Sequence, residues 1–65
     1  MIVLETYTEQ FGLPDFEPER RVINQQFFLD SDYQRVELLS RELYGHLTNL
    51  NEKKGSKYGC RFYEV

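Results

Sequence analysis

The sequence predicts a small α+β domain in which one long helix packs on one face of a three-stranded, mainly antiparallel sheet. Two observations carry this prediction. A helical pattern with a start and a stop signal extends from Ser31 to Lys54, about a third of the 65 residues. Segments rich in strand-favouring residues flank the helix, two before it and one after it, so the expected order is β-β-α-β.

A loop separates the first two predicted strands. Residues Met1–Thr8 begin with an apolar run and contain no turn residue, and Arg21–Leu29 (RVINQQFFL) is similarly rich in β-branched and aromatic residues. Between them, Glu9–Arg20 carries one glycine and two prolines, which are typical of a loop.

The helix has recognisable ends. Ser31 can cap its N-terminus, and Gln34, three residues later, would complete a capping box. Gly55 can end the helix in a left-handed conformation, with Lys53 and Lys54 in the last turn, where the helix dipole favours positive charge. Apolar residues recur between these ends at spacings of three and four, at Val36, Leu39, Leu43, Leu47 and Leu50.

The last element is a strand over Tyr58–Val65, reached through the polar turn Lys53–Lys57. If the first two strands form a hairpin, the helix returns the chain so that the last strand is antiparallel to the first. The simplest sheet therefore has the order 2-1-3 with Met1–Thr8 in the centre. No repeat or linker divides the chain, and residues 1–65 form a single predicted domain.

One helix covers only one face of such a sheet. Successive side chains of a strand point to opposite faces of the sheet, so faces can be assigned by counting in steps of two. This counting predicts that Ile2 and Leu4 face the helix, together with Tyr58, Cys60 and Phe62 of the last strand. In the second strand Ile23, Phe27 and Leu29 share one face, and Val22 and Phe28 share the other. The apolar residues expected on the open face are Val3, Tyr7, Val22, Phe28 and Tyr63.

The open face predicts an interaction surface, because a contiguous apolar patch of several hundred Å² marks binding sites on small proteins. The alternative is that the loop covers this face with Phe11, Leu13 or Phe16. The acidic loop is itself a candidate docking element, with Phe16 as an anchor and Glu17 as an orienting carboxylate. Leu38, opposite the apolar stripe, adds an exposed leucine on the outer helix surface.

Catalytic chemistry finds little support in these residues. The chain has one histidine and one cysteine, and its glycines form no phosphate-binding loop. Glu42 and His46 have a spacing that could share a metal, but two ligands are too few. Cys60 is expected inside the domain, where a thiol behaves as a small apolar group. We therefore expect no enzyme, no cofactor, no metal and no small-molecule substrate.

Nucleic-acid binding is the alternative function. The C-terminal stretch interleaves aromatic residues with Lys53, Lys54, Lys57 and Arg61, a composition that suits phosphates and stacked bases. The isoelectric point near 5.0 argues against it, because phosphate binding normally needs clustered positive charge.

The expected function is therefore non-enzymatic protein binding, as a small regulatory inhibitor, adaptor or accessory subunit. A chain of 65 residues has a thin stability margin and often relies on a partner or on a second copy of itself, so a homodimer is also expected. A single cysteine suits the reducing cytoplasm, and neither a leader nor a membrane-spanning run is evident. The small size would suit a virally encoded inhibitor of a host enzyme, although no motif supports that origin.

Overall fold

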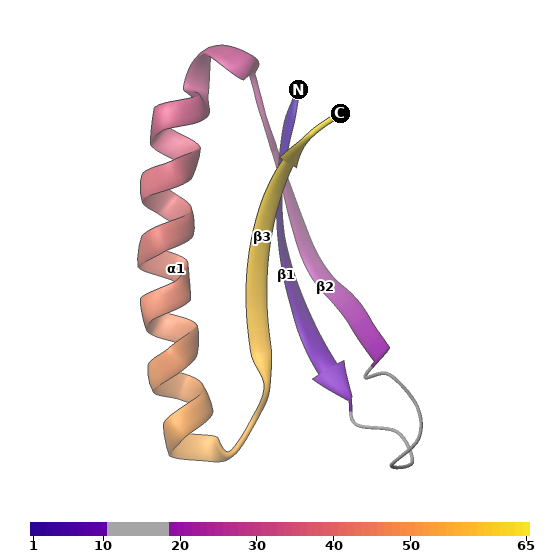
Figure 1. Ribbon diagram of the computed structural model, residues 1–65, viewed down its shortest axis with the longest axis vertical. Coiled ribbons are helices and arrows are strands. Elements are labelled where there is room, and N and C mark those ends of the chain that lie inside the picture. Colours follow the sequence, from indigo (N-terminus) through magenta and orange to yellow (C-terminus); the bar gives the residue numbers. More distant parts are fainter. Residues whose placement is uncertain (11–18) are drawn as a thin grey trace.

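The computed structural model contains a three-stranded antiparallel sheet of order β2-β1-β3 and one long helix, α1, that lies along one face of the sheet (Figure 1). The structure describes residues 1–10 and 19–65. This arrangement confirms the predicted fold class, element order and strand order. The elements are β1 (Ile2–Gln10), β2 (Glu19–Phe28), the 3-10 turn η1 (Asp30–Asp32), α1 (Tyr33–Lys54) and β3 (Tyr58–Glu64).

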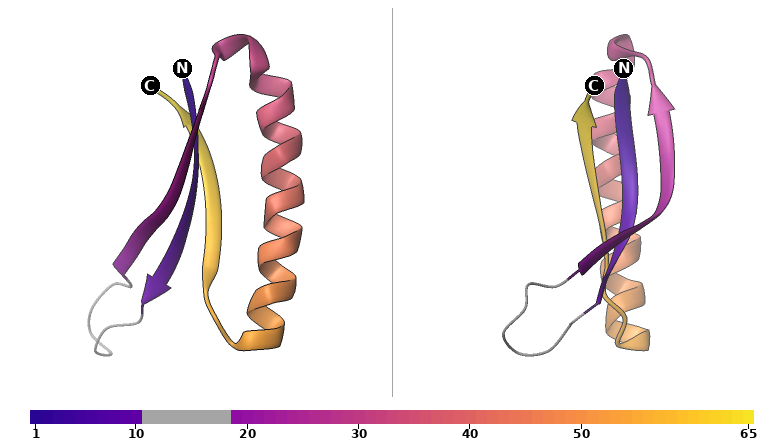
Figure 2. Two further views of the ribbon diagram at one scale, coloured as in Figure 1. Left: turned by 180° about the vertical axis from the view of Figure 1, so that it is seen from behind. Right: turned by 90° about the vertical axis from the view of Figure 1, so that its right-hand side faces the viewer.

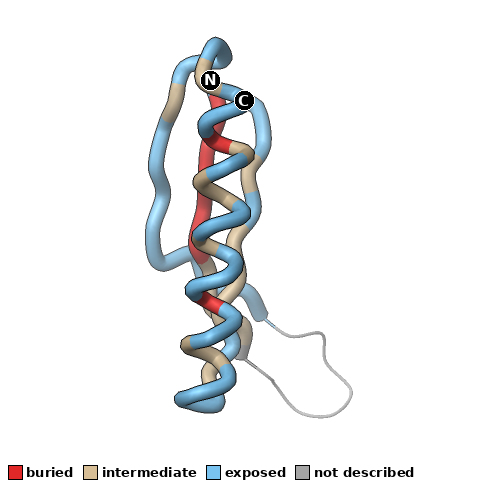
Figure 3. The backbone as a smooth tube through the Cα atoms, turned by 90° about the vertical axis from the view of Figure 1, so that its left-hand side faces the viewer, coloured by how far each residue is buried: buried red, intermediate tan, exposed pale blue. Residues whose placement is uncertain are grey.

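The central strand β1 supplies most of the core. Ile2 and Leu4 point toward α1 and pack around Val36, and all three side chains are buried. Phe28, Leu39, Leu43 and Phe62 close this cluster as partly buried neighbours. The buried residues of β1 lie in the first half of the strand, behind the helix (Figure 3). The predicted inward direction of Ile2 and Leu4 and the apolar stripe of α1 are thus confirmed.

The helix lies over β3 and β1 and leaves β2 largely uncovered (Figures 2 and 3). Nearly every residue of β2 is exposed, and the side that faces the helix carries the polar residues Asn24 and Gln26 next to α1. Polar side chains gain nothing from being removed from water, so this part of β2 stays exposed although it lies beside the helix. In the described part of the chain, no helix combines the length and apolarity needed to cross a membrane.

The start of the helix differs from the prediction. Residues Asp30–Asp32 form a 3-10 turn, α1 begins at Tyr33, and the N-cap residue is Asp32, without a side-chain capping bond. The amide of Asp32 donates instead to the carbonyl of Leu29 at 2.9 Å, so backbone acceptors replace the capping box expected at Ser31. The predicted end is confirmed: Gly55 has a φ of 65°, and its amide donates to Asn51 at 2.8 Å.

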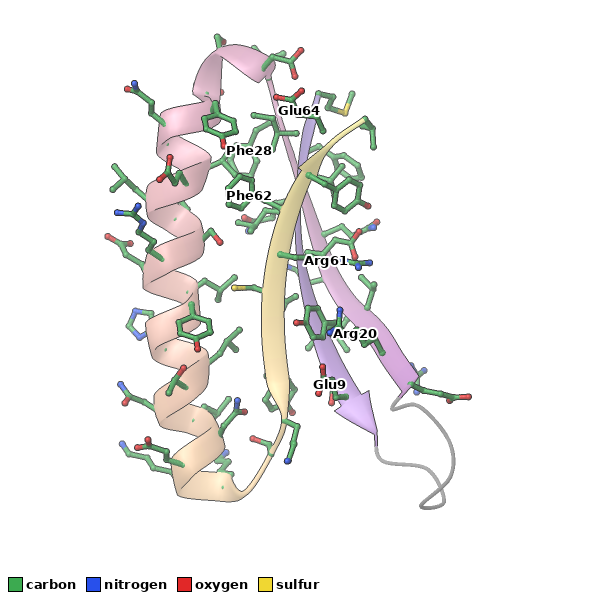
Figure 4. All side chains as sticks on the ribbon, viewed as in Figure 1. Glu9, Arg20, Phe28, Arg61, Phe62 and Glu64 are labelled. Carbon is green, nitrogen blue, oxygen red and sulfur yellow. The ribbon has the colours of Figure 1, made fainter. Side chains whose placement is uncertain are left out.

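A β-bulge in β2 changes which of its side chains face the helix. Thr6 pairs with Asn24, but the next residue of β1, Tyr7, pairs with Val22, so Ile23 is an extra residue in β2. Counting in steps of two fails across this point. Phe28 therefore packs against the core on the helix side, where Figure 4 shows it together with Phe62. The predicted place of Phe28 on the open face is wrong, and Phe27 lies there instead, opposite Val3.

Candidate interaction surface on the open sheet face

The face of the sheet turned away from α1 is organised in rows that cross the three strands. Each row has a residue of β1 in the centre, flanked by one residue of β2 and one of β3. The three rows are Phe27–Val3–Tyr63, Gln25–Glu5–Arg61 and Val22–Tyr7–Gly59.

Apolar side chains gather at one end of this face. Met1 and Val65 exchange backbone hydrogen bonds of 2.9 and 3.4 Å, which places them opposite one another beside the Val3 row. Leu29 continues β2 in an extended conformation. Val3 is only 2% exposed, whereas its apolar neighbours are between 37% and 73% exposed. We call this group the end patch; it consists of Met1, Val3, Phe27, Leu29, Tyr63 and Val65.

A carboxylate lies directly beside the end patch. Glu5 is 2% exposed although it stands on the face that the helix does not cover. The hydroxyl of Tyr63 donates to Oε1 of Glu5, and Nη2 of Arg61 lies 3.4 Å from Oε2. The guanidinium of Arg61 also approaches the ring of Tyr63, at 5.8 Å from its centroid. Side chains of β3 therefore cover Glu5 and satisfy both of its oxygens.

This environment changes the acidity of both partners. The hydrogen bond from Tyr63 holds the pKa of Glu5 below its ordinary value of 4.5, and the positive charge of Arg61 acts in the same direction, whereas burial opposes both. The same hydrogen bond raises the pKa of Tyr63 above 10.0. Glu5 is therefore an ionised hydrogen-bond acceptor at neutral pH, which is a structural role.

The lowered pKa of Glu5 predicts a specific loss of stability in acid. Because the folded-state pKa lies below 4.5, the contribution of the carboxylate is complete above that value and is lost as the pH falls through the folded-state pKa. We expect Glu5→Gln to flatten the pH dependence of the urea midpoint between about pH 5 and pH 3. Glu52→Gln, at an exposed helix position, is the matched control. Parallel pH curves for wild type and Glu5→Gln would contradict this assignment.

The third row closes the face at its other end. The ring of Tyr7 lies over Gly59 so closely that a Cβ at position 59 would be 2.6 Å from the tyrosine Cζ. The guanidinium of Arg20 stacks on the same ring, at 4.9 Å from its centroid. Arg20 also pairs with Glu9 at 3.2 Å, and Figure 4 shows these two side chains next to one another. Gly59 thus lets Tyr7 lie flat on the sheet, and this end of the face is charged and polar rather than apolar.

Four of the predicted site residues meet on this face: Val3, Tyr7, Val22 and Tyr63. Leu38 is exposed on the outer surface of α1 and belongs to no row of the sheet. Phe16 and Glu17 lie outside the described residues, as do Phe11 and Leu13, and so does the predicted covering of the face by the loop.

Counting in steps of two also places Glu5 on the open face, beside Val3 and Tyr7, but its burial was not predicted, and Phe27 and Leu29 were not predicted as parts of this surface. Phe27 and Leu29 follow from the bulge, which leaves no clear mark in the sequence. Glu5 did carry a signal: an acidic residue in the middle of an apolar central strand needs partners, and its cross-strand neighbours include an arginine.

The basic residues of the alternative site are distributed over different elements. Lys53 and Lys54 are in the last turn of α1, whereas Arg61 lies midway along β3, on the face away from the helix (Figure 4). Arg61 is also paired with Glu5. Lys57 lies between these elements, and its carbonyl accepts a bond from the amide of Glu9.

Two further grooves flank α1. On the side of β2, a cavity of about 250 Å³ brings together Glu42 and His46 with the polar residues of β2. Within residues 1–10 and 19–65, no group of three or more acidic, histidine or cysteine side chains is arranged to hold a metal. On the side of β3, a groove of about 410 Å³ is lined by aromatic and charged side chains.

No protein-family model matches the chain, and comparisons with curated proteins and with solved structures give no match. Its function must therefore be inferred from its own surfaces.

Proposed function

We propose that this chain is a non-enzymatic protein-binding module that docks through the end patch, acting as a small regulatory inhibitor, adaptor or accessory subunit. The observation that carries the proposal is the gathering of five exposed apolar side chains around the buried Val3. Scattered exposed apolar residues are common on proteins, but a contiguous group on one face of a sheet is typical of binding surfaces.

The surroundings of the end patch support the same function. Its two aromatic residues, Phe27 and Tyr63, stand on either side of Val3, and aromatic anchors dominate the energetics of protein interfaces. The adjoining row of Gln25, Glu5 and Arg61 is polar and already hydrogen-bonded. An apolar centre beside a satisfied polar border is the usual composition of a protein interface.

The nucleic-acid alternative has no comparable observation in its favour. The side chains it requires are on separate elements, and the one that lies on the open face, Arg61, is paired with a carboxylate. A non-enzymatic role is supported by Glu5, because both of its oxygens are occupied by protein partners. For the location we propose the cytoplasm, where the free thiol of Cys60 would remain reduced.

Two leucines of similar exposure provide a matched test. Leu29, in the end patch, is 71% exposed, and Leu38, on the outer face of α1, is 61% exposed. We expect Leu29→Asp to reduce the affinity for the physiological partner about tenfold or more, because it puts a charge into the apolar contact. Leu38→Asp is expected to leave it unchanged.

The measurement is quantitative affinity capture with the immobilised wild-type chain and each variant, with circular dichroism confirming that all three are folded. Proteins retained by wild type and Leu38→Asp but lost with Leu29→Asp would support the proposal. If no retained protein depends on Leu29, the end patch is not the docking surface.

A further inference from the structure

We infer that two copies of this chain associate through the free edge of β3, which would join their sheets into one six-stranded sheet with the two helices side by side. This inference is independent of the proposed function, because it concerns a different surface.

The hydrogen-bond pattern identifies which residues of β3 point away from the sheet. Val65 exchanges bonds with Met1, and the carbonyl of Lys57 accepts a bond from the amide of Glu9. In an antiparallel pair these positions alternate, so the odd-numbered residues of β3 bond to β1. The backbone groups of the even-numbered residues therefore point to the outer edge.

One of these outward residues is already satisfied. The side-chain amide of Asn51 donates to the carbonyl of Tyr58 at 2.9 Å, and its oxygen accepts from the amide of Tyr58 at 2.9 Å. Asn51 thus acts as a short mimic of a neighbouring strand. Among the described residues, β3 pairs with no strand other than β1, so Cys60, Phe62 and Glu64 present an unpaired edge.

These three residues are symmetric about Phe62, which fixes the register with a second copy. A two-fold axis through Phe62 pairs Phe62 with Phe62 and Cys60 with Glu64 of the second copy. The outward backbone amides and carbonyls of one copy then lie opposite those of the other and can form hydrogen bonds. Like charges do not face one another in this register. The other edge of the sheet is a poorer candidate, because β2 contains a bulge and charged residues at its start, features that protect edge strands from pairing.

The position of α1 fits the same arrangement. Strands in a sheet are about 4.8 Å apart, so two helices that each lie over β3 and β1 would be roughly 7–10 Å apart across the axis, close to the usual distance between packed helices. The groove of about 410 Å³ between α1 and β3 faces this axis. The exposed rings of Tyr33 and Tyr44 line it, and Tyr33 packs edge to face on Phe62 at 5.8 Å.

The charges on this side of α1 are self-complementary. Glu37 and Arg41 line the same groove and pair with each other at 2.9 Å. Two copies would bring two acids and two bases together around the axis, with no net charge. A second copy is therefore an electrostatically balanced occupant of this groove.

The register provides a direct test, because Cys60 is the only cysteine. Residues that pair directly in this way have Cα atoms about 5.5 Å apart, which suits a disulfide. We expect Glu64→Cys to form a reducible covalent dimer in mild oxidant, through Cys60 of one copy and position 64 of the other. The wild type and the Cys60→Ser/Glu64→Cys double variant should not, since their single cysteines lie far apart across the axis. Efficient cross-linking of either control would overturn the register.

A charge exchange on α1 tests the interface without altering the strand. Glu37→Arg gives a chain with two bases in the groove, and Arg41→Glu gives one with two acids. We expect each variant alone to dimerise on the order of fivefold more weakly than wild type and the mixture to form a heterodimer. Light scattering of the wild type should show about twice the monomer mass of 7.9 kDa. Three results would contradict the inference. The wild type could stay monomeric at all concentrations up to about 1 mM. The Glu64→Cys dimer could lack the link between Cys60 and position 64, or the two charge variants could show no preference for the mixed pair.

Discussion

Replacing Leu4 by alanine is expected to remove a large fraction of the stability of the domain. Leu4 is 4% exposed, lies near the start of the central strand β1 opposite Phe62, and packs under α1 beside Val36. Truncation of a buried leucine costs about 2–5 kcal/mol. A domain of 65 residues has a total free energy of unfolding of about 3–10 kcal/mol, so the loss is a large fraction of the whole.

The measurement is urea unfolding monitored by circular dichroism. Leu38→Ala is the control, because it is the same substitution at an exposed position of α1. We expect the control to change the free energy of unfolding by less than about 0.5 kcal/mol. Similar losses for the two variants would mean that Leu4 does not belong to the core described here.

Replacing Asn51 by alanine is expected to cause the second large effect, about 1–3 kcal/mol of stability. Its side chain makes two bonds to the backbone of Tyr58 and accepts a third, from Ser56 at 3.2 Å. These bonds fix the angle between the end of α1 and the start of β3. Without them, an amide and a carbonyl of a partly buried strand lose their partners.

Asn49 serves as the control, because it is an exposed asparagine of the same helix. Asn49→Ala is expected to be neutral or slightly stabilising, since alanine is the better helix former. Amide hydrogen exchange would also show faster exchange at Tyr58 in Asn51→Ala alone. Unchanged exchange at Tyr58 would contradict the role given to Asn51.

The sequence was sufficient to predict the architecture of the domain. The helix period, the strand composition and the glycine at position 55 are local signals, and each agrees with the observed fold. The start of the helix was misplaced because Ser31 resembles an N-cap, whereas the chain there forms a 3-10 turn whose donors bond to the backbone.

The candidate surface could be predicted only in part, for a specific physical reason. The assignment of a face depends on counting in steps of two, and one extra residue, Ile23, reverses the assignment of every residue after it in β2. Phe28 was therefore predicted on the open face and Phe27 and Leu29 on the opposite face, whereas the structure has the reverse arrangement. Tyr63 was assigned correctly because β3 pairs with β1 without interruption.

Tertiary partners explain the remaining omissions. The burial of Glu5 depends on Tyr63 and Arg61, more than fifty residues away in the sequence. The capping of Tyr58 by Asn51 depends on the exact end of the helix. Neither contact follows from composition or periodicity, because each requires the relative position of two elements.

The two proposed contacts use different parts of one small sheet. The end patch lies on the open face, whereas the dimer would form at the edge of β3. In the proposed dimer both open faces would lie on the same side of the joined sheet, so that two end patches could engage one partner or two copies of it.

The most direct test of the central claim, that the end patch is the docking surface, is site-specific photo-crosslinking. Benzoyl-phenylalanine would replace either Phe27, which is 62% exposed in the end patch, or Leu38, which is 61% exposed on the outer helix. We predict that illumination in cells links the partner protein to position 27 and not to position 38. Cross-links from position 38 alone, or equal cross-links from both positions, would contradict the proposal.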